Sequence, residues 1–561
     1  MQPMENNFRV STFNVVGLST NRKRAIRRRV RFGIALIGIL AAPMAFAGTP
    51  NVKAVGMTIA SAEAGMKAGR FTSQDLTEAF LKRIDTYNPT YRAIITMNPN
   101  ALSEARVQDQ RRENGDQLGR LAGIPVVVKD TMDMAGLPTT AGWAPLSRRA
   151  GGVSLIPAWD SPVVRRLLAA GAVILGKTNL PPFSVSGDNT VGSWAGSTLN
   201  AAAPDRMPGG SSAGTATAVA GSFAVVGLGE ETGGSIQNPA AAEGLVGIKP
   251  TFGLVPNVGV VPLGGSTRDV VGPIASNVRD AALVLDVLAG YTPEDPKTVA
   301  SIGHVPSDGY ESLLGKVSLR GKRIGLFGPG WMTAPLSPDT QKLYNEVIVK
   351  LKEMGAIVVR DPFAGTVFAS LAKPTGDWQY DQRGEESVAY DLNLYLEHLG
   401  PSAAIHSLAE LVFKTGQNPF AEGNILGYER AQPEFLASLA DPTRPPPLQN
   451  FLALREHYLA VFNSVMNQHH LDALVFPQAL YETPRVNSTA HIIATTVSQV
   501  NIAGLPLVCV PAGAYPSGSP FGIVFVGRMW DEQQLLALAY DWERHMPPRV
   551  PPTLRTIQDT H

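Results

Sequence analysis

Three short segments of the chain carry polar residues that could do chemistry in unusual settings. Lys129 closes an apolar run, Ser211 and Ser212 follow two glycines, and Ser235 closes a Thr-Gly-Gly-Ser turn. A buried lysine loses proton affinity because desolvation penalises its charged form, so it could serve as a neutral base. Consecutive glycines let backbone N–H groups point together at an anionic oxygen. Taken singly, each segment also fits an ordinary role: a surface lysine, a helix N-cap or a glycine turn.

A second reading of the serines makes Ser212 the nucleophile. Residues 210–214 fit Gly-x-Ser-x-Gly, the nucleophile elbow of α/β-hydrolases, which needs a histidine later in the chain. All nine histidines follow Ser212, the nearest being His304. The elbow also needs a strand directly before it, whereas residues 204–210 form a Pro/Gly-rich loop. Ser212 in a Ser-His-Asp esterase is therefore kept as an alternative.

The elements that must position these residues have the texture of an α/β protein. After Gly123, short apolar runs alternate with helical segments, which is typical of a largely buried sheet. One run lies inside residues 171–178, which match the P-loop pattern, but its Ala-Val-Ile-Leu middle predicts a buried strand rather than a phosphate cradle. The predicted strands are 124–128, 172–175, 223–228, 471–476 and 505–510.

The segment before this alternation predicts a helix. Thr72 to Asp75 resembles a capping box, and apolar residues follow at four-residue spacing. The pair Asn88-Pro89 is expected to end the helix.

Residues 361–470 differ from their surroundings and are interpreted as a helical insertion or cap. They are rich in aromatic residues and contain a Pro-rich break at 444–447. This insertion is expected to form part of the substrate pocket wall. Its aromatic residues are either pocket-lining or core residues, namely Trp378, Tyr380, Tyr390, Tyr395, Phe413 and Phe420.

Composition and charge exclude several classes of protein. With 561 residues, 44% hydrophobic and 17% charged, the chain can bury a large core and is not intrinsically disordered. One cysteine, Cys509, excludes an intramolecular disulfide framework and a cysteine-based zinc cluster. The first 47 residues hold eight basic groups and one acid, so they carry +7 and the remainder −6 of the net +1. A mildly acidic body argues against a nucleic-acid partner.

The basic N-terminal segment predicts a secretory signal peptide over residues 1–47. A cationic run ends at Arg31, the uncharged run 32–47 follows, and Ala45-Phe46-Ala47 fits a cleavage site. The apolar run is shorter than the ~20 residues that span a bilayer. We expect an exported protein, periplasmic or secreted, with no stable membrane partner after cleavage. An uncleaved anchor and the twin-arginine route stay open.

Together the three segments carry a family resemblance. The stretch GGSSAGTATAVAGSFAVVGLGEETGGSIQNPAAAEGLVGIKPTFG, residues 209–253, resembles the Gly/Ser-rich signature of the amidase signature family of serine amidohydrolases. Segments such as GAVILGKTN and NIAGLPLVCVP are also similar, and the likeness spans residues 55–300 and 470–545. It implies an α/β fold in which helices cover both faces of a large mixed sheet. It places the catalytic domain in residues 48–561.

The resemblance also implies a Ser-cisSer-Lys catalytic group. Carried onto this sequence, Ser235 is the nucleophile, Ser211 is the bridging serine after a cis peptide bond, and Lys129 is the base. The backbone N–H groups of Thr232, Gly233, Gly234 and Ser235 would stabilise the oxyanion. The expected substrate is a small-molecule amide, with no cofactor or metal, and a homodimer is left open.

Two residues depart from the family pattern. Glu231 stands where the family often has Asp, and Gln237 stands where it often has Arg, so an ion pair between position 237 and Asp269 is lost. This weakens a support of the site rather than the site itself.

Other functions on the same fold stay open. Ester or carbamate substrates share the acyl-enzyme chemistry, and the glutaminase component of a tRNA-dependent amidotransferase has the same signature. Predicted export argues against that component. The last alternative is a non-catalytic binding protein on the same fold.

Overall fold

An 11-stranded sheet forms the centre of the computed structural model, which describes residues 52–556. The predicted signal peptide, residues 1–47, and the expected boundary at residue 48 lie outside the described residues. In spatial order the strands are β1 (Ile94–Met97), β3 (Val173–Thr178), β2 (Pro125–Lys129), β4 (Val226–Glu231), β6 (Val270–Ala275), β5 (Val246–Lys249), β10 (Leu507–Ala514), β11 (Pro520–Val526), β9 (Ala473–Pro477), β7 (Arg323–Leu326) and β8 (Ile357–Val359).

The sheet is mixed, and its central strands are buried on both faces. β2 runs parallel to β3 and β4, whereas β4 is antiparallel to β6. All residues of β2, β3 and β4 are buried, which explains why these strands appear in the sequence as continuous apolar runs. The P-loop match ends in β3, a buried strand as expected. The predicted α/β class is confirmed.

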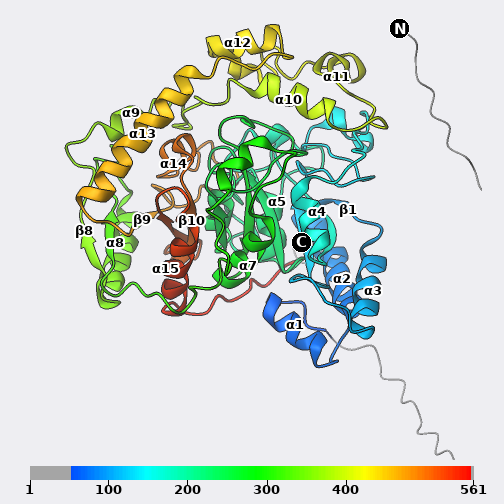
Figure 1. The fold of residues 1–561 in the computed structure, drawn as a ribbon, viewed down its shortest axis with the longest axis horizontal. Helices are drawn as coiled ribbons and strands as arrows, with labels where there is room; N and C mark the ends of the chain where they lie inside the picture. Colours follow the sequence, from blue (N-terminus) through cyan, green and yellow to red (C-terminus); the bar gives the residue numbers. More distant parts are fainter. Residues whose placement is uncertain (1–51, 557–561) are drawn as a thin grey trace, which may run out of the picture. The chain divides into compact units, whose positions relative to one another are not determined.

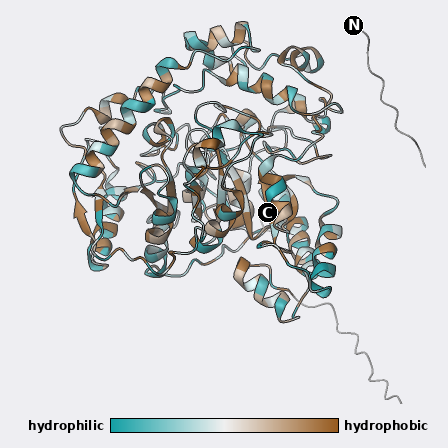
Figure 2. Ribbon diagram, in the orientation of Figure 1, coloured by the Kyte–Doolittle hydropathy of each residue, from teal (hydrophilic) through white to brown (hydrophobic). Residues whose placement is uncertain are grey.

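Helices cover both faces of this sheet (Figure 1). α5 and α6 pack against the central strands, and α7 and α15 form a second packed pair. Figure 2 shows hydrophobic and hydrophilic residues alternating along the outer helices, as expected for helices that bury one face. The helices outside the insertion are α1 (Ile59–Lys67), α2 (Ser73–Tyr91), α3 (Ala101–Glu113), α4 (Pro162–Ala169), α5 (Ala213–Ala220), α6 (Gln237–Ala242), α7 (Val278–Leu288), α8 (Pro338–Glu353), α14 (Val497–Ala503) and α15 (Glu532–Arg544).

The helix predicted after Thr72 forms, but its predicted end is wrong. Thr72 and Asp75 make the expected capping box at the start of α2. Pro89 lies inside the last turn, and the helix ends only at Tyr91, capped by Arg92 in a left-handed conformation. A proline is tolerated there because the Arg92 N–H still bonds to the Asn88 carbonyl at 2.7 Å.

The insertion 361–470 is helical and builds a second hydrophobic cluster (Figure 1). Tyr395 and Phe420 are buried in this cluster together with Trp143 and Phe183 from outside the insertion. The helices of this insertion are therefore anchored to the rest of the fold by apolar packing. They are α9 (Phe368–Leu371), α10 (Val388–Glu397), α11 (Leu408–Thr415), α12 (Pro433–Ala440) and α13 (Gln449–Gln468).

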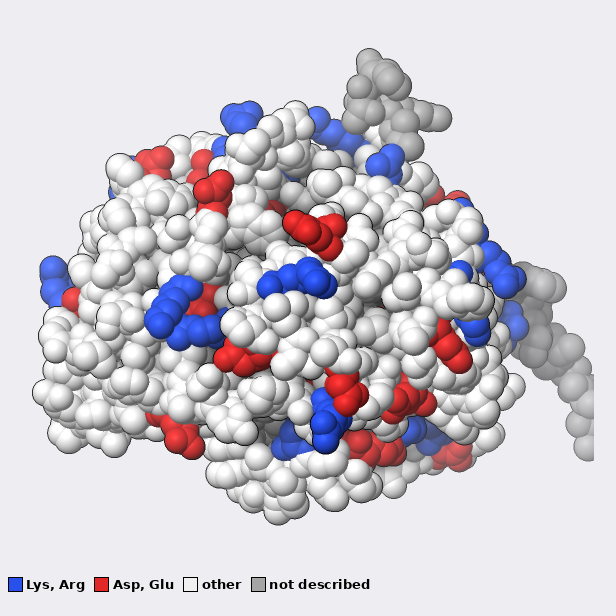
Figure 3. Space-filling view, turned by 90° about the horizontal axis from the view of Figure 1, so that it is seen from above, with Lys and Arg blue, Asp and Glu red and all other residues white. Residues whose placement is uncertain are grey.

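Charged side chains of both signs are interspersed on the face drawn in Figure 3. That face carries no continuous basic stripe of the kind that binds nucleic acid. Within residues 52–556, no helix has the length and apolar character needed to cross a membrane.

Candidate active site

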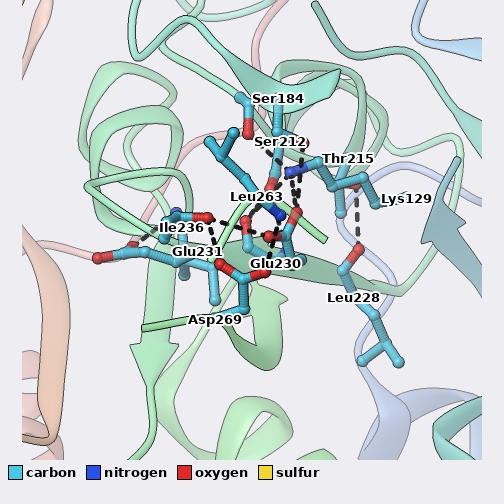
Figure 4. Close-up of polar contacts among 12 residues, drawn as sticks. Lys129, Ser184, Ser212, Thr215, Leu228, Glu230, Glu231, Ile236, Leu263 and Asp269 are labelled. Carbon is cyan, nitrogen blue, oxygen red and sulfur yellow. Dashed lines mark hydrogen bonds and ion pairs between the residues drawn. The ribbon is translucent and has the colours of Figure 1, made fainter. Parts of the chain in front are cut away.

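Lys129, the last residue of β2, is fully buried at the centre of the site (Figure 4). Its Nζ lies 2.7 Å from Ser211 Oγ, 3.1 Å from the carbonyl oxygen of Glu230 and 2.7 Å from Glu230 Oε2. Burial lowers the pKa of Lys129 below its ordinary value, and the Glu230 carboxylate opposes that shift. Lys129 therefore contacts a serine hydroxyl in an environment that disfavours its charged form.

The loop before α5 places Ser211 and Ser212 in different roles. Ser211 is buried, follows a cis peptide bond from Gly210, and contacts Lys129. The Ser212 hydroxyl instead donates to the carbonyl of Glu230 and accepts from its N–H, each at 3.2 Å. Ser212 thus fastens the loop to β4, while its own N–H donates to the carbonyl of Ser235 at 3.2 Å.

The nucleophile-elbow reading of Ser212 is not favoured by this arrangement. No strand leads directly into Ser212, and within the described chain no histidine is hydrogen-bonded to its hydroxyl. Both bonds of that hydroxyl go to the backbone of Glu230. The Ser212 hydroxyl is therefore engaged by the backbone and does not line the cavity.

The turn from Thr232 to Ser235 directly follows β4 and presents its N–H groups without protein partners. Among residues 52–556, none accepts a hydrogen bond from the four N–H groups of this turn. Gly234 has φ +100°, a conformation that side chains rarely adopt, and a Cβ on Gly233 would lie 2.3 Å from the Tyr380 ring. The Ser235 hydroxyl is likewise free of partners in the described chain and faces the pocket. Free N–H groups beside a free hydroxyl can stabilise an oxyanion.

Glu231 fastens this turn to the helix that follows it. Its Oε2 accepts from the N–H groups of Ile236 at 2.7 Å and Gln237 at 3.1 Å (Figure 4). Its Oε1 accepts from the side chain of Gln237 at 2.8 Å and of Asn501 at 3.0 Å. Gln237 therefore supports the turn through a neutral amide in place of an ion pair.

Two buried carboxyl groups lie beside Lys129, and of these only Asp269 is named from the sequence, as an ion-pair partner, whereas Glu230 is not. Thr232 Oγ1 donates its one proton to Asp269 Oδ1 at 2.5 Å and lies 3.3 Å from Glu230 Oε1, so it sits between the two carboxyl groups. Burial and the neighbouring Glu230 raise the pKa of Asp269 to about 7. An acid at the end of an apolar strand, like the lysine at the end of β2, was the available signal for Glu230.

A cavity of about 70 Å³ opens in front of Ser235. Of the aromatic candidates left open between pocket and core, Trp378 and Tyr380 line it, together with Glu385 and Tyr428, which no motif marks in the sequence. The structure places the other aromatic candidates elsewhere. Tyr395 and Phe420 are buried core residues, Tyr390 is half-buried away from the cavity lining, and Phe413 is exposed to solvent.

The ionisable groups that line this cavity are acidic apart from one histidine. His491 Nδ1 lies 2.6 Å from Asp188 Oδ2, and Tyr428 donates to Glu385 at 3.2 Å. Tyr380 also donates to Glu385. Among the described residues that line the cavity there is no lysine or arginine.

Comparisons with known proteins agree along most of the chain. A family model described as Amidase matches residues 75–536. The A-subunit of the glutamyl-tRNA(Gln) amidotransferase from Chloroflexus aurantiacus is 33% identical over 508 residues, covering 87% of this chain and 96% of the relative. The peptide amidase from Stenotrophomonas maltophilia has a TM-score of 0.72 at 32% identity, covering 89% of this chain and 99% of its own. An amidase family protein from Bacillus anthracis has a TM-score of 0.72 at 26% identity, covering 89% and 93%.

Proposed function

Because the chain belongs to the amidase signature family, whose members hydrolyse or transfer amide C–N bonds, we propose that it hydrolyses small-molecule amides through an acyl-enzyme on Ser235. The observation that carries the proposal is the 2.7 Å contact between the buried Lys129 Nζ and Ser211 Oγ. Ser211 lies beside the nucleophile segment because the Ser212 N–H bonds to the Ser235 carbonyl.

The proposed reaction moves one proton along the relay and back. Neutral Lys129 accepts the proton of Ser211, Ser211 accepts the proton of Ser235, and Ser235 Oγ bonds to the carbonyl carbon. The carbonyl π electrons move to the oxygen, which the N–H groups of residues 232–235 stabilise. The relay then returns the proton to the leaving nitrogen as the C–N bond breaks. Water then attacks the ester carbonyl of the acyl-enzyme with help from the same relay, and the carboxylic acid leaves as Ser235 regains its proton. The proposed reaction uses neither metal nor cofactor.

A substrate panel tests the reaction class. Purified protein would be offered primary amides, aryl amides and C-terminal peptide amides, each with a matched ester and carbamate, and product release would be measured. We expect turnover of at least one amide class. Hydrolysis of esters or carbamates without any amide would contradict the amide proposal. It would show that the same acyl-enzyme chemistry acts on C–O bonds or on carbamates instead.

The acidic cavity favours neutral or cationic substrates. Asp188 and Glu385 line it, and no lysine or arginine lines it among the described residues. A substrate carboxylate would therefore lose its hydration in this cavity without gaining a cationic partner. The C-terminal carboxamide is the same in leucinamide, N-acetylleucinamide and N-succinylleucinamide. For ammonia release from it, we expect kcat/KM of the first two to be at least about tenfold above that of the succinyl compound, a difference in activation free energy of roughly 1.4 kcal/mol.

The same comparison addresses the amidotransferase relatives. Glutamine carries a free carboxylate near its amide, so we expect it to be a poor substrate for this cavity. Efficient glutamine hydrolysis, or a preference for the succinyl compound, would contradict the charge argument and favour the glutaminase component of an amidotransferase.

We also propose that the protein is exported. The support is the basic run ending at Arg31, the apolar run 32–47 and the Ala-Phe-Ala sequence. N-terminal sequencing of the protein produced in its native host should begin near Gly48. A mature chain that still begins before Arg22 would contradict cleavage.

A further inference from the structure

Glu230 supplies two of the three polar contacts of the Lys129 amine. The Lys129 Nζ lies 2.7 Å from the Glu230 carboxylate and 3.1 Å from the carbonyl oxygen of the same residue. The third contact is Ser211 Oγ at 2.7 Å. Lys129 and Glu230 are both fully buried, so water does not screen their interaction.

This arrangement determines where the lone pair of a neutral lysine points. A neutral amine has two N–H groups and one lone pair, whereas an ammonium has three N–H donors and no acceptor. One N–H group of the amine can donate to Glu230 Oε2 and the other to the backbone carbonyl oxygen of Glu230. The lone pair is then left to accept the hydroxyl proton of Ser211. After Lys129 takes that proton, the carboxylate of Glu230 faces the new ammonium at 2.7 Å.

On the basis of the function proposed above, we propose that Glu230 is a positioning residue of the proton relay. Its side chain and carbonyl direct the lone pair of Lys129 at Ser211, and its carboxylate balances the charge that forms on Lys129 as Ser235 attacks. Glu230 acts through Lys129 and does not line the cavity.

The other contacts of the Glu230 carboxylate hold it in place. Ser184 Oγ donates to Oε2 at 3.3 Å, and Thr232 Oγ1 lies 3.3 Å from Oε1. Oε2 is therefore held by Ser184 as well as by Lys129, and Oε1 lies against the Thr232 hydroxyl. A buried carboxylate held by Ser184 and Lys129 can orient the amine without reorganising during the reaction.

Further charged groups also face this pair and must be separated from it. Asp269 and Glu231 act on Lys129 through their charges, and Arg268 donates to the carbonyl of Thr232 at 3.1 Å. On the neighbouring strand, Lys177 pairs with Asp130 at 2.9 Å. Asp269 is the group most easily confused with Glu230, because it is also buried and next to Thr232.

The proposal predicts a shift in the pH dependence of acylation when the charge of Glu230 is removed. A carboxylate stabilises the protonated form of Lys129, so its loss makes Lys129 neutral at lower pH. In Glu230→Gln the acidic limb should move about 1–3 pH units lower, the usual effect of one close opposite charge. The plateau rate should fall about 10- to 100-fold because the ammonium loses its charge-assisted partner.

The rate of labelling by a fluorophosphonate, followed from pH 5 to 10, measures this without knowledge of the natural substrate. Glu230→Asp should keep the limb near its wild-type position, because it keeps the charge. Glu230→Thr provides a second neutral variant if Glu230→Gln folds poorly. Glu243→Gln is the matched control, since Glu243 is a buried carboxyl group bonded to Thr217 and the backbone of residues 201 and 202, away from the relay.

The outcomes separate this proposal from the proposed function. Suppose that wild-type protein is labelled at Ser235, but the acidic limb of the labelling rate lies at the same pH in both neutral variants as in wild type. Glu230 is then not part of the relay, and the acyl-enzyme mechanism stands. A limb that moves further in Asp269→Asn than in Glu230→Gln would assign the titration to Asp269 and overturn the proposal. If wild-type protein is not labelled at Ser235, the proposed function itself fails.

Discussion

Lys129→Ala is expected to lower turnover by roughly 10²–10⁴-fold, the usual loss when a general base is removed. Lys129 is the buried group in contact with Ser211 Oγ. Burial lowers the pKa of Lys129, which favours the neutral form that a base requires. Lys129→Arg should fail as well, because arginine stays protonated at any usable pH. The measurement is kcat/KM on an accepted amide across pH, which should rise as Lys129 loses its proton.

A matched control separates this loss from destabilisation. Removing Lys129 leaves Glu230 buried without its partner, which typically costs about 3–5 kcal/mol of stability. Lys177 forms the comparable buried pair with Asp130 but contacts neither serine of the relay. Lys177→Met should therefore lower the melting temperature yet keep turnover per folded molecule.

The histidines provide the opposing test. A histidine-based mechanism would place the base at one of the nine histidines, and His491, paired with Asp188 in the cavity, is the first to examine. Near-full turnover in Lys129→Ala combined with an inactive histidine variant would refute the relay.

Ser235→Ala is expected to lower turnover on the order of 10⁶-fold, the scale seen when a serine hydrolase loses its nucleophile. The Ser235 hydroxyl faces the cavity without a protein partner among the described residues, beside four free N–H groups. Substrate binding should persist, because the substitution removes only one hydroxyl from the cavity wall. Turnover and Kd for a slow substrate analogue, measured on folded protein, check both parts. Turnover within about tenfold of wild type would place the nucleophile elsewhere.

The local features of the site could be predicted from the sequence. β2, β3 and β4 are buried on both faces, so their residues appear as apolar runs, and Lys129 at the end of such a run was noticeable. The glycine turn after β4 was visible because Gly234 needs a conformation that other residues rarely adopt. The catalytic roles of these residues stay predictions until they are tested.

Contacts between distant segments could not be predicted in this way. Tyr380 and Glu385 reach the cavity from the insertion, and no spacing in the sequence relates them to Ser235. Glu230 was missed because its importance comes from facing Lys129, 101 residues away in the chain. Pro89 predicts the end of a helix, but the helix continues through it to Tyr91. A proline there removes only its own N–H donor, and the Arg92 N–H still bonds to the Asn88 carbonyl.

Mapping the adduct of a fluorophosphonate tests the central claim most directly, because the reagent bonds covalently to the activated serine. Intact-mass analysis of wild-type protein followed by peptide mapping should find a single adduct, on Ser235. Ser212→Ala should still be labelled there, and Ser235→Ala should not be labelled at all. An adduct on Ser212, or no adduct on folded protein that hydrolyses amides, would contradict the acyl-enzyme on Ser235.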